Sequence, residues 1–365
     1  MSTTFQRTLN PNPVPREQRE AVLADPGFGQ HFTDHMITVE WTGDVEAGTG
    51  SWGQPQLKPY GPLQLDPAAA VLHYGQEIFE GLKAYRHDDG SVWSFRPQRN
   101  AERLNRSARR LALPELPEEI FLDSLAELLA VDQSWVPSGD GQSLYLRPFM
   151  IATETFLGVR PARKVLFAVI ASPAGSYFGT PSAVDIWLSE NYARAGVGGT
   201  GAAKCGGNYA ASLIAQMEGD AHGCAQVIFT DPNRDQAIEE LGGMNVFFVF
   251  DDDRLVTPEL TGTILEGVTR SSVIELARAR GLSVEERPFT LDEWRWGAAD
   301  GSLREVFACG TAAVISPVGR LISASETIGP DDAEPGEITM ALRQELLDLQ
   351  TGAAEDTRGW LARLV

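Results

Sequence analysis

Lysine and cysteine are both scarce in this sequence. Arginine supplies 26 of the 30 basic residues, and the four lysines are Lys58, Lys83, Lys164 and Lys204. The three cysteines are Cys205, Cys224 and Cys309. Their odd number and the lack of a CxxC or metal-finger spacing argue against a disulfide framework and give no sign of a metal site. Free thiols in a reducing compartment are therefore expected.

Long apolar runs are missing as well. The longest, VLFAVIA at 165–171 and NVFFVF at 245–250, are far shorter than the ~20 residues that span a bilayer. No secretory signal or transit peptide is recognisable at the start, so a cytoplasmic protein is expected. The formal net charge of -20 opposes binding to a phosphate backbone. The arginine-rich segment 99–110 has helical spacing of its apolar residues, which indicates an amphipathic helix, and nucleic acid is not an expected partner.

Helix and strand signals alternate along the chain, which predicts a mixed fold of the α/β or α+β class. Helices are expected at 76–83, from Pro97 onward, at 118–131, 208–219 and 268–280, and in the C-terminal tail. Strands are expected at 36–41, 143–152, 164–172, 184–190, 225–230 and 244–250, and around 304–316. Thr290 and Glu293 have the spacing of a capping box at the start of one more helix.

The length of 365 residues predicts two domains. The best candidate for a boundary is the stretch PAGSYFGTPSA, which is rich in glycine, proline and serine. We therefore expect a small N-terminal domain at 1–174, a linker at 175–183 and a large C-terminal domain at 184–365.

Lys204 lies in a loop of small residues, GGTGAAKCGGNYAAS. A phosphate-binding P-loop is disfavoured because it needs glycine before the lysine and a hydroxyl after it, whereas Ala203 and Cys205 stand here. GVGGTG at 196–201 has the letters of a dinucleotide fingerprint, but the glycine pair after Cys205 would break the helix that the fingerprint requires. The third interpretation is a lysine whose desolvated, neutral amine forms a Schiff base with an aldehyde cofactor. From this loop alone, an exposed lysine without a chemical role is equally consistent.

An aldehyde cofactor of the pyridoxal phosphate type needs an anion site and an acidic partner for its ring nitrogen. LEGVTRSSV places a glycine turn before a helix, so the amides of Val268 and Thr269 are candidates for the phosphate. IEELGGMN places Glu239 and Glu240 between apolar residues, and either could be the acidic partner. A solvated turn is the alternative for this second segment.

Taken together, these segments resemble the branched-chain amino-acid aminotransferases, pyridoxal phosphate enzymes of fold type IV. The resemblance covers nearly the whole chain and rests on motifs in order: LHYGQEIFEGLKAYR, FRPQRNAERLNRSARRL, SLYLRPF, KCGGNYAAS, EELGGMN, LEGVTRSSV and EVFACGTAAV. It implies two domains with the cofactor at their interface. It also implies transfer of the amino group of leucine, isoleucine or valine to 2-oxoglutarate by a ping-pong Schiff-base reaction, and a homodimer.

The resemblance assigns roles to individual residues. Lys204 is the catalytic residue that bonds to the cofactor, and Glu240 and Tyr209 contact its ring. The phosphate ligands are Arg103, Val268, Thr269 and Thr311. The apolar walls of the substrate pocket are Phe32, Tyr74, Phe79 and Tyr177, and the α-carboxylate is received by Tyr145 and by the amides near Thr311 and Ala312. Arg147 is expected to meet the side-chain carboxylate of glutamate, a charge-assisted contact that suits arginine.

Two departures from the family pattern stand out. Gly243 occupies a place where some members have threonine, so one contact to the cofactor ring is expected to be missing or replaced by water. Ala313 and Ser316 stand where some members have a Cys-x-x-Cys redox switch, so that regulation is not expected. A D-amino-acid aminotransferase or an aminodeoxychorismate lyase of the same fold, or a nucleotide-binding module built on GVGGTG, remains the alternative.

Overall fold

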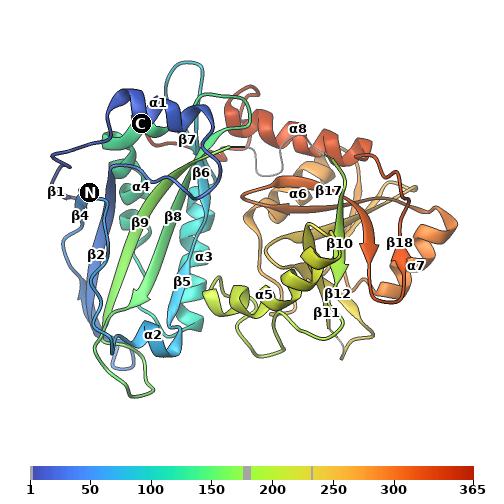
Figure 1. Cartoon of the computed structure of the whole chain (residues 1–365), viewed down its shortest axis with the longest axis horizontal. Coiled ribbons are helices and arrows are strands. Elements are labelled where there is room, and N and C mark those ends of the chain that lie inside the picture. Colours follow the sequence, from blue (N-terminus) through green and yellow to red (C-terminus); the bar gives the residue numbers. More distant parts are fainter. Residues whose placement is uncertain (1–2, 176–181, 232) are drawn as a thin grey trace. The chain divides into compact units, whose positions relative to one another are not determined.

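The computed structural model describes residues 3–175, 182–231 and 233–365 (Figure 1). Its contacts divide the chain into two compact units. The first contains residues 1–177, 203–206 and 349–365, and the second contains 178–202 and 207–348. The short segment around Lys204 and the C-terminal segment thus belong with the N-terminal unit. The domain boundaries expected at 174 and 184 stay a prediction.

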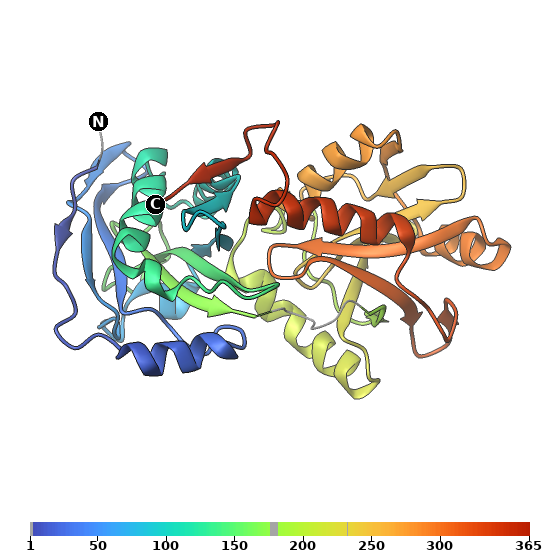
Figure 2. The same cartoon turned by 90° about the horizontal axis from the view of Figure 1, so that it is seen from above.

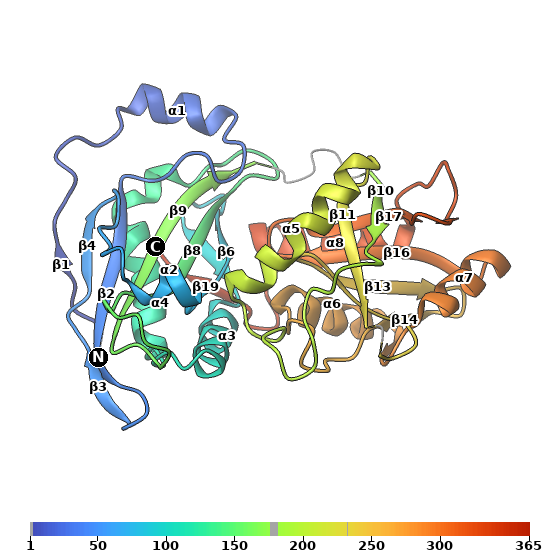
Figure 3. The same cartoon turned by 60° about the horizontal axis from the view of Figure 1, so that its bottom comes forward.

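The first unit is a mainly antiparallel sheet with helices packed beside it. Its strands are β1 (Gln6–Arg7), β2 (His35–Asp44), β3 (Thr49–Trp52), β4 (Gln56–Pro59), β5 (Glu77–Phe79), β6 (Leu82–Arg86), β7 (Val92–Phe95), β8 (Ser143–Ala152), β9 (Lys164–Ala174) and β19 (Leu361–Arg363). They lie in the order β1-β4-β2-β9-β8-β6-β7-β19, with β3 on β2 and β5 on β8. The helices are α1 (Arg16–Ala24), α2 (Ala70–Tyr74), α3 (Pro97–Arg110) and α4 (Glu118–Asp132), followed by the 3-10 turn Gln133–Trp135. Helices α3 and α4 pack against each other, and α4 packs on β2 and β9 (Figure 3).

The burial pattern of β8 and β9 explains the position of the predicted substrate residues. β9 lies between β2 and β8, and nearly all of its residues are buried, as its apolar sequence predicts. Along β8, buried residues alternate with half-buried ones, and Tyr145 and Arg147 are both half-buried. Because side chains two apart on a strand share a face, these two residues lie on the same side of the sheet.

The second unit is a mixed sheet. Its strands are β10 (Val184–Leu188), β11 (Gln226–Asp231), β12 (Ala237–Leu241), β13 (Asn245–Phe250), β14 (Arg254–Thr257), β15 (Ser283–Glu286), β16 (Leu303–Gly310), β17 (Val314–Ile322) and β18 (Thr327–Ile328). They lie in the order β12-β11-β10-β17-β16-β13-β14-β15, with β18 on β17. The helices are α5 (Gly206–Ala221), α6 (Val268–Ala279), α7 (Leu291–Asp300) and α8 (Glu337–Thr351). Helix α8, the red helix in Figure 2, lies beside β17. Arg343 of α8 donates hydrogen bonds to the carbonyls of Ala313 and Ile315 on or next to this strand.

Most of the expected elements are confirmed. The strand at 143–152 has the bounds that were predicted, and α3 begins at Pro97. The hydroxyl of Thr290 accepts a hydrogen bond of 3.1 Å from the amide of Glu293, as a capping box requires. The C-terminal tail differs in part, since β19 follows α8 and pairs with β7. In the described ranges, no helix combines the length and the apolar character needed to cross a membrane.

The helix expected at 76–83 is wrong, because this segment forms strands β5 and β6. Ile78 and Leu82 are four residues apart and both buried, which mimics one face of a helix. Gly81 between them lies against the side chain of Tyr145, where a Cβ would stand only 2.0 Å from the tyrosine hydroxyl. Glu80 is fully buried, a position that a carboxylate tolerates only with a partner.

Candidate active site

Lys204 is anchored in the first unit through its backbone. Its amide donates a 2.9 Å hydrogen bond to the hydroxyl of Ser107 on α3, and its carbonyl accepts one of 2.9 Å from the amide of Phe79 on β5. The neighbouring side chains of Ala203 and Cys205 are buried in the core of this unit, whereas Lys204 itself is half-buried. The buried neighbours therefore fix the segment, and Lys204 does not lie on an exposed loop.

The aromatic ring of Phe79 lies within reach of two cations. The Nζ atom of Lys204 is 4.9 Å from the ring centroid, and the guanidinium carbon of Arg147 is 4.7 Å from it. Arg147 also donates a 2.9 Å hydrogen bond from Nη2 to the hydroxyl of Tyr145, whose ring has Phe28 at its edge. The structure thus brings together Lys204, Phe79, Tyr145 and Arg147, and adds Phe28, which the sequence analysis did not single out.

One nitrogen of Arg147 lacks an acceptor. Its Nε atom is buried and makes no hydrogen bond. Among the described residues, few buried polar side-chain atoms lack a hydrogen-bond partner in this way. A buried donor without a partner costs free energy, which an acceptor supplied by a ligand would recover. The Nε atom of Arg147 is therefore a candidate donor for an anion in the first unit.

The other predicted wall residues have different neighbours. Phe32 stacks on Tyr60 with 4.9 Å between ring centroids. Tyr74, at the end of α2, is exposed, and its hydroxyl donates to the carbonyl of Leu157. Tyr177 lies outside the described residues. The roles of these three residues stay predictions.

Arg103, a predicted phosphate ligand, is bound to a carboxylate that sequence reasoning missed. Its Nε and Nη2 atoms donate hydrogen bonds of 2.8 Å each to the two oxygens of Glu80, and Asn100 donates a third of 2.8 Å. Burial alone would raise the pKa of Glu80, but the charge and hydrogen bonds of Arg103, and the charge of Lys204, lower it below its usual value. The signal in the sequence was the carboxylate inside the apolar run IFEGL.

A second carboxylate beside Lys204 was also missed. Glu77 accepts a hydrogen bond from the amide of Gly206, the first residue of α5. Burial raises the pKa of Glu77, and the Gly206 amide and the charge of Arg147 oppose that rise. Glu77 therefore lies among the predicted site residues of the first unit.

In the second unit, Glu240 lies in a buried polar cluster. Its Oε1 atom is 2.7 Å from Nη1 of Arg194 and accepts a 2.8 Å hydrogen bond from the amide of Leu265, while Asn245 donates to Oε2 at 3.5 Å. Both members of the Glu240–Arg194 pair are almost fully buried. Arg194 was not foreseen, and its position in the segment NYARAG carries no motif that marks it.

Glu239, the adjacent carboxylate, points to a different environment. Burial raises the pKa of Glu239, and a hydrogen bond with Thr263 partly opposes this rise. Since neighbouring residues of a strand face opposite sides of the sheet, only one of the two can serve a given site. Of the two carboxylates, Glu240 is the one paired with Arg194.

The predicted phosphate ligands of the second unit lie at a helix end and at a turn. Val268 and Thr269 open α6, and the N-cap residue Gly267 offers no side chain to their amides. A Cβ on Gly267 would stand 2.1 Å from Oδ1 of Asn245, so a larger residue there would have to displace the Asn245 side chain. Thr311 lies in the turn between β16 and β17 together with Ala312. The amides at the start of α6 have no acceptor within the helix and suit an anion.

Tyr209 and Gly243 are neighbours in the second unit. Tyr209 lies in the first turns of α5, and a Cβ on Gly243 would be 3.6 Å from its ring, an ordinary contact distance. With glycine instead of threonine at position 243, this residue therefore adds no side chain to the side of the Tyr209 ring that faces it.

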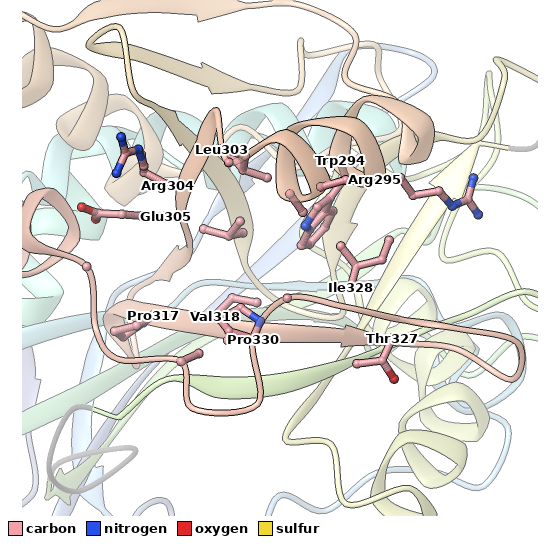
Figure 4. A pocket seen from close by; sticks show the side chains of 18 of the residues that line it. Trp294, Arg295, Leu303, Arg304, Glu305, Pro317, Val318, Thr327, Ile328 and Pro330 are labelled. Atoms are coloured by element: carbon pink, nitrogen blue, oxygen red, sulfur yellow. The ribbon is translucent and has the colours of Figure 1, made fainter.

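A cavity of about 790 Å³ in the second unit is separate from all predicted site residues (Figure 4). It lies between α7 and strands β16, β17 and β18, with Trp294, Leu303 and Ile328 among the residues that line it. Within the described residues, no group of three or more histidine, cysteine, aspartate or glutamate side chains is placed to hold a metal ion.

Comparison with known proteins places this geometry in a family. The model of class IV aminotransferases matches residues 77–321. The chain is 55% identical to the branched-chain-amino-acid aminotransferase of Mycolicibacterium smegmatis over 99% of this chain and 98% of that protein. Its fold is similar to the crystal structure of the Escherichia coli branched-chain amino acid aminotransferase, with a TM-score of 0.73, 28% identity, and coverage of 85% of this chain and 97% of that one.

A further structural neighbour was solved with a ligand. It is a branched-chain amino acid aminotransferase from T.th. complexed with N-(5'-phosphopyridoxyl)-L-glutamate, with a TM-score of 0.71, 28% identity, and coverage of 90% of this chain and 98% of that one. The expected mixed α and β fold of type IV is confirmed by these neighbours. The chain therefore belongs to the class IV aminotransferases and, within them, to the family of branched-chain-amino-acid aminotransferases.

Proposed function

We propose that this protein transfers the amino group of leucine, isoleucine or valine to 2-oxoglutarate, reversibly, with pyridoxal 5'-phosphate as its cofactor and Lys204 as its catalytic residue. The observation that carries the proposal is the position of Lys204, whose backbone is anchored and whose amine lies 4.9 Å from the ring centroid of Phe79, with the guanidinium carbon of Arg147 4.7 Å from the same ring. The relatives named above carry the same activity in their names. None of these relatives is named a D-amino-acid aminotransferase or an aminodeoxychorismate lyase, so the comparisons favour the branched-chain activity over these two alternatives.

The described residues fit the proposed cofactor on two observations. Glu240 is a buried carboxylate held beside Arg194, and a carboxylate of this kind keeps a pyridine nitrogen protonated. The start of α6 offers the amides of Val268 and Thr269 to an anion. When bound, pyridoxal phosphate supplies the aldehyde that accepts the amino group and a ring that withdraws electrons from the substrate.

We propose the following roles for the cofactor-binding residues. Glu240 pairs with the ring nitrogen, and Tyr209 contacts the ring hydroxyl. The phosphate is held by Arg103, Val268, Thr269 and Thr311. For Arg103 this role is shared with Glu80, which already occupies its Nε and Nη2 atoms.

The proton transfer is assigned to Lys204. Its neutral amine would take the proton from the α-carbon of the amino acid, and the ammonium so formed would deliver a proton to the carbon that the cofactor supplies as its aldehyde. The Nζ atom lies 4.9 Å from the ring centroid of Phe79, within the distance at which an aromatic face interacts with a cation. Lysine suits the task since its amine gains and loses a proton, which a guanidinium does not.

The substrate residues explain how one pocket would accept both leucine and glutamate. Phe32, Tyr74, Phe79 and Tyr177 form apolar walls in this proposal. Tyr145, with the amides near Thr311 and Ala312, receives the α-carboxylate that all substrates share. Arg147 meets the side-chain carboxylate of glutamate through its buried, unpaired Nε. The neighbour complexed with a phosphopyridoxyl derivative of glutamate supports a site for that amino acid.

We also propose that the chain forms a homodimer in the cytoplasm, with domains at 1–174 and 184–365 joined by the linker 175–183. Light scattering of the purified protein tests whether it is a homodimer, and limited proteolysis tests whether the chain is cleaved at the linker between the two domains.

The proposed function is tested with Lys204→Ala, with Lys164→Ala as the matched control because Lys164 is an exposed lysine on β9. Purified Lys204→Ala should keep its circular dichroism spectrum, lose the visible absorbance of the bound cofactor and lose nearly all transamination of leucine with 2-oxoglutarate. The control should match the parent protein in all three measurements. A leucine rate in Lys204→Ala close to that of the parent would overturn the assignment.

A further inference from the structure

Glu80 is a buried carboxylate that four hydrogen bonds hold in place. Arg103 donates two of them, from Nε to Oε1 and from Nη2 to Oε2, and each is 2.8 Å long. Asn100 donates a third of 2.8 Å to Oε2, and the amide of Gly81 donates a fourth of 3.3 Å to the same oxygen. Glu80 is 0% exposed and Arg103 is 3% exposed. Solvent therefore stabilises neither charge, and each depends on the other.

The backbone of the first unit places the two charges side by side. The amide of Glu80 donates a 2.7 Å hydrogen bond to the carbonyl of Pro148 on β8, which fixes the junction between β5 and β6. Asn100 and Arg103 are three residues apart on α3, so they lie on one face of that helix. Helix α3 in turn packs against β5. The ion pair is therefore a part of the fold of the first unit.

A guanidinium that already has a buried carboxylate is a weaker site for a second anion. In the proposed function Arg103 also holds the phosphate. That phosphate would bring a second negative charge to a guanidinium whose charge Glu80 already balances, and like charges repel strongly where solvent is excluded. Glu80 therefore stabilises the protein without its cofactor and opposes the arriving phosphate. Both effects have one cause, since an interaction that favours the unliganded state lowers the affinity of the ligand.

We propose that Glu80 is a resident counter-ion of Arg103, whose charge stabilises the cofactor-free fold and limits how tightly the phosphate site binds an anion. When an amide replaces the carboxylate, the positive charge of Arg103 is left buried and unbalanced, and a bound phosphate becomes its counter-ion. The affinity for phosphate then rises as the stability of the phosphate-free protein falls. This inference rests on the proposed function, in which Arg103 holds the phosphate.

Glu80→Gln tests this inference in the full-length chain prepared without cofactor, with inorganic phosphate as the ligand. In phosphate-free buffer the variant should unfold at a lower urea concentration than the parent, because Arg103 has lost its counter-ion. Calorimetric titration should give a phosphate Kd about tenfold lower than that of the parent, as expected when one like charge is removed from a buried site. At a phosphate concentration of about ten times the parent's Kd, the folding equilibrium constant should rise about elevenfold in the parent and about a hundredfold in the variant.

Three further variants separate the causes. Glu80→Asp keeps the charge, so its phosphate Kd should stay within about twofold of the parent's value. Glu40→Gln is the matched control, because Glu40 is an exposed glutamate on β2, and it should equal the parent in both measurements. The double variant Glu80→Gln with Arg103→Met should lose the added affinity for phosphate, because the unbalanced guanidinium is gone.

A phosphate Kd in Glu80→Gln that is equal to or higher than that of the parent would overturn the inference, and so would a tenfold lower Kd in Glu80→Asp. A Glu80→Gln protein that folds only with phosphate would support it, whereas one that stays unfolded at saturating phosphate would overturn it, because phosphate would not have replaced the carboxylate. Equal phosphate affinity in Glu80→Gln and in the double variant would instead remove Arg103 from the phosphate ligands of the proposed function. The two failures are therefore distinct.

Discussion

The buried pair of Glu80 and Arg103 offers a quantitative test of the first unit. Their side chains are 0% and 4% exposed, and two hydrogen bonds of 2.8 Å join them. Arg103→Met removes the cation and leaves the carboxylate with Asn100 as its hydrogen-bonding partner from α3. Loss of one member of a buried ion pair costs about 3–5 kcal/mol. The double variant Arg103→Met with Glu80→Met should regain most of that loss, because no uncompensated charge remains.

The pH dependence of this loss separates a charge effect from a packing effect. In the parent protein the pKa of Glu80 is lower than in the unfolded chain, so its pairing stabilises the fold above the unfolded pKa of ~4.3 and is lost as pH falls through the folded pKa. In Arg103→Met, burial without the cation raises the pKa of Glu80, so Glu80 is protonated in the folded variant. Protonating it costs free energy of folding at pH 7, and this cost disappears in acid, where Glu80 is protonated in the unfolded chain as well. The difference in stability should therefore be large at pH 7 and shrink below about pH 4.

Urea denaturation followed by circular dichroism measures this difference for the cofactor-free parent and variant at both pH values. A loss below about 1 kcal/mol at pH 7 would refute the argument. So would a large loss that does not change with pH, because it would come from packing. If Arg103 served the phosphate alone, the variant would keep its stability and lose only affinity for the cofactor.

The remaining predictions concern Arg147 and the Glu240 cluster. Arg147→Leu should lower kcat/KM for glutamate roughly ten- to hundredfold, since a charge-assisted hydrogen bond contributes ~1.5 to 3 kcal/mol, and should affect leucine far less. Single-turnover rates with each amino acid measure this, and equal losses would assign Arg147 to the shared α-carboxylate. Glu240→Gln should bind the cofactor but react slowly, and Glu239→Gln should react nearly as the parent; the reverse result would exchange their roles. Arg194→Met should lower the unfolding midpoint in urea because it leaves the buried charge of Glu240 without its cation, and adding Glu240→Gln should restore part of it.

The sequence predicted those elements whose local pattern agrees with their tertiary environment. The run at 164–172 is apolar because β9 is covered on both faces, and Pro97 opens α3 because a proline suits the first turn of a helix. The segment at 76–83 was misread because its apolar residues are spaced by four, whereas pairing with β8 decides its conformation. Pairing of this kind joins residues some 70 positions apart, which no local window contains.

For the candidate site, the sequence indicated the single groups and missed their partners. Lys204 and Glu240 stood out through the glycine-rich loop and the family motifs. Glu77, Glu80 and Arg194 did not, although each is bound to or lies beside a residue that did. Such residues can be recognised only together with their partners, because the sequence does not show which cation or amide will lie beside a buried carboxylate in the folded chain.

The scarcity of lysine agrees with this arrangement. Three guanidinium groups lie buried or half-buried among the candidate residues: Arg103 beside Glu80, Arg194 beside Glu240, and Arg147 beside Tyr145. A guanidinium stays charged when it is buried, and its planar donors match a carboxylate, so arginine is suited to fixed charges. A lysine at these positions would risk losing its proton on burial and with it the compensation of the carboxylate. Lys204 has the opposite requirement, because in the proposed reaction its amine must lose and regain a proton in every turnover. The chain thus uses arginine where a charge has to be permanent and keeps a lysine where it has to be reversible.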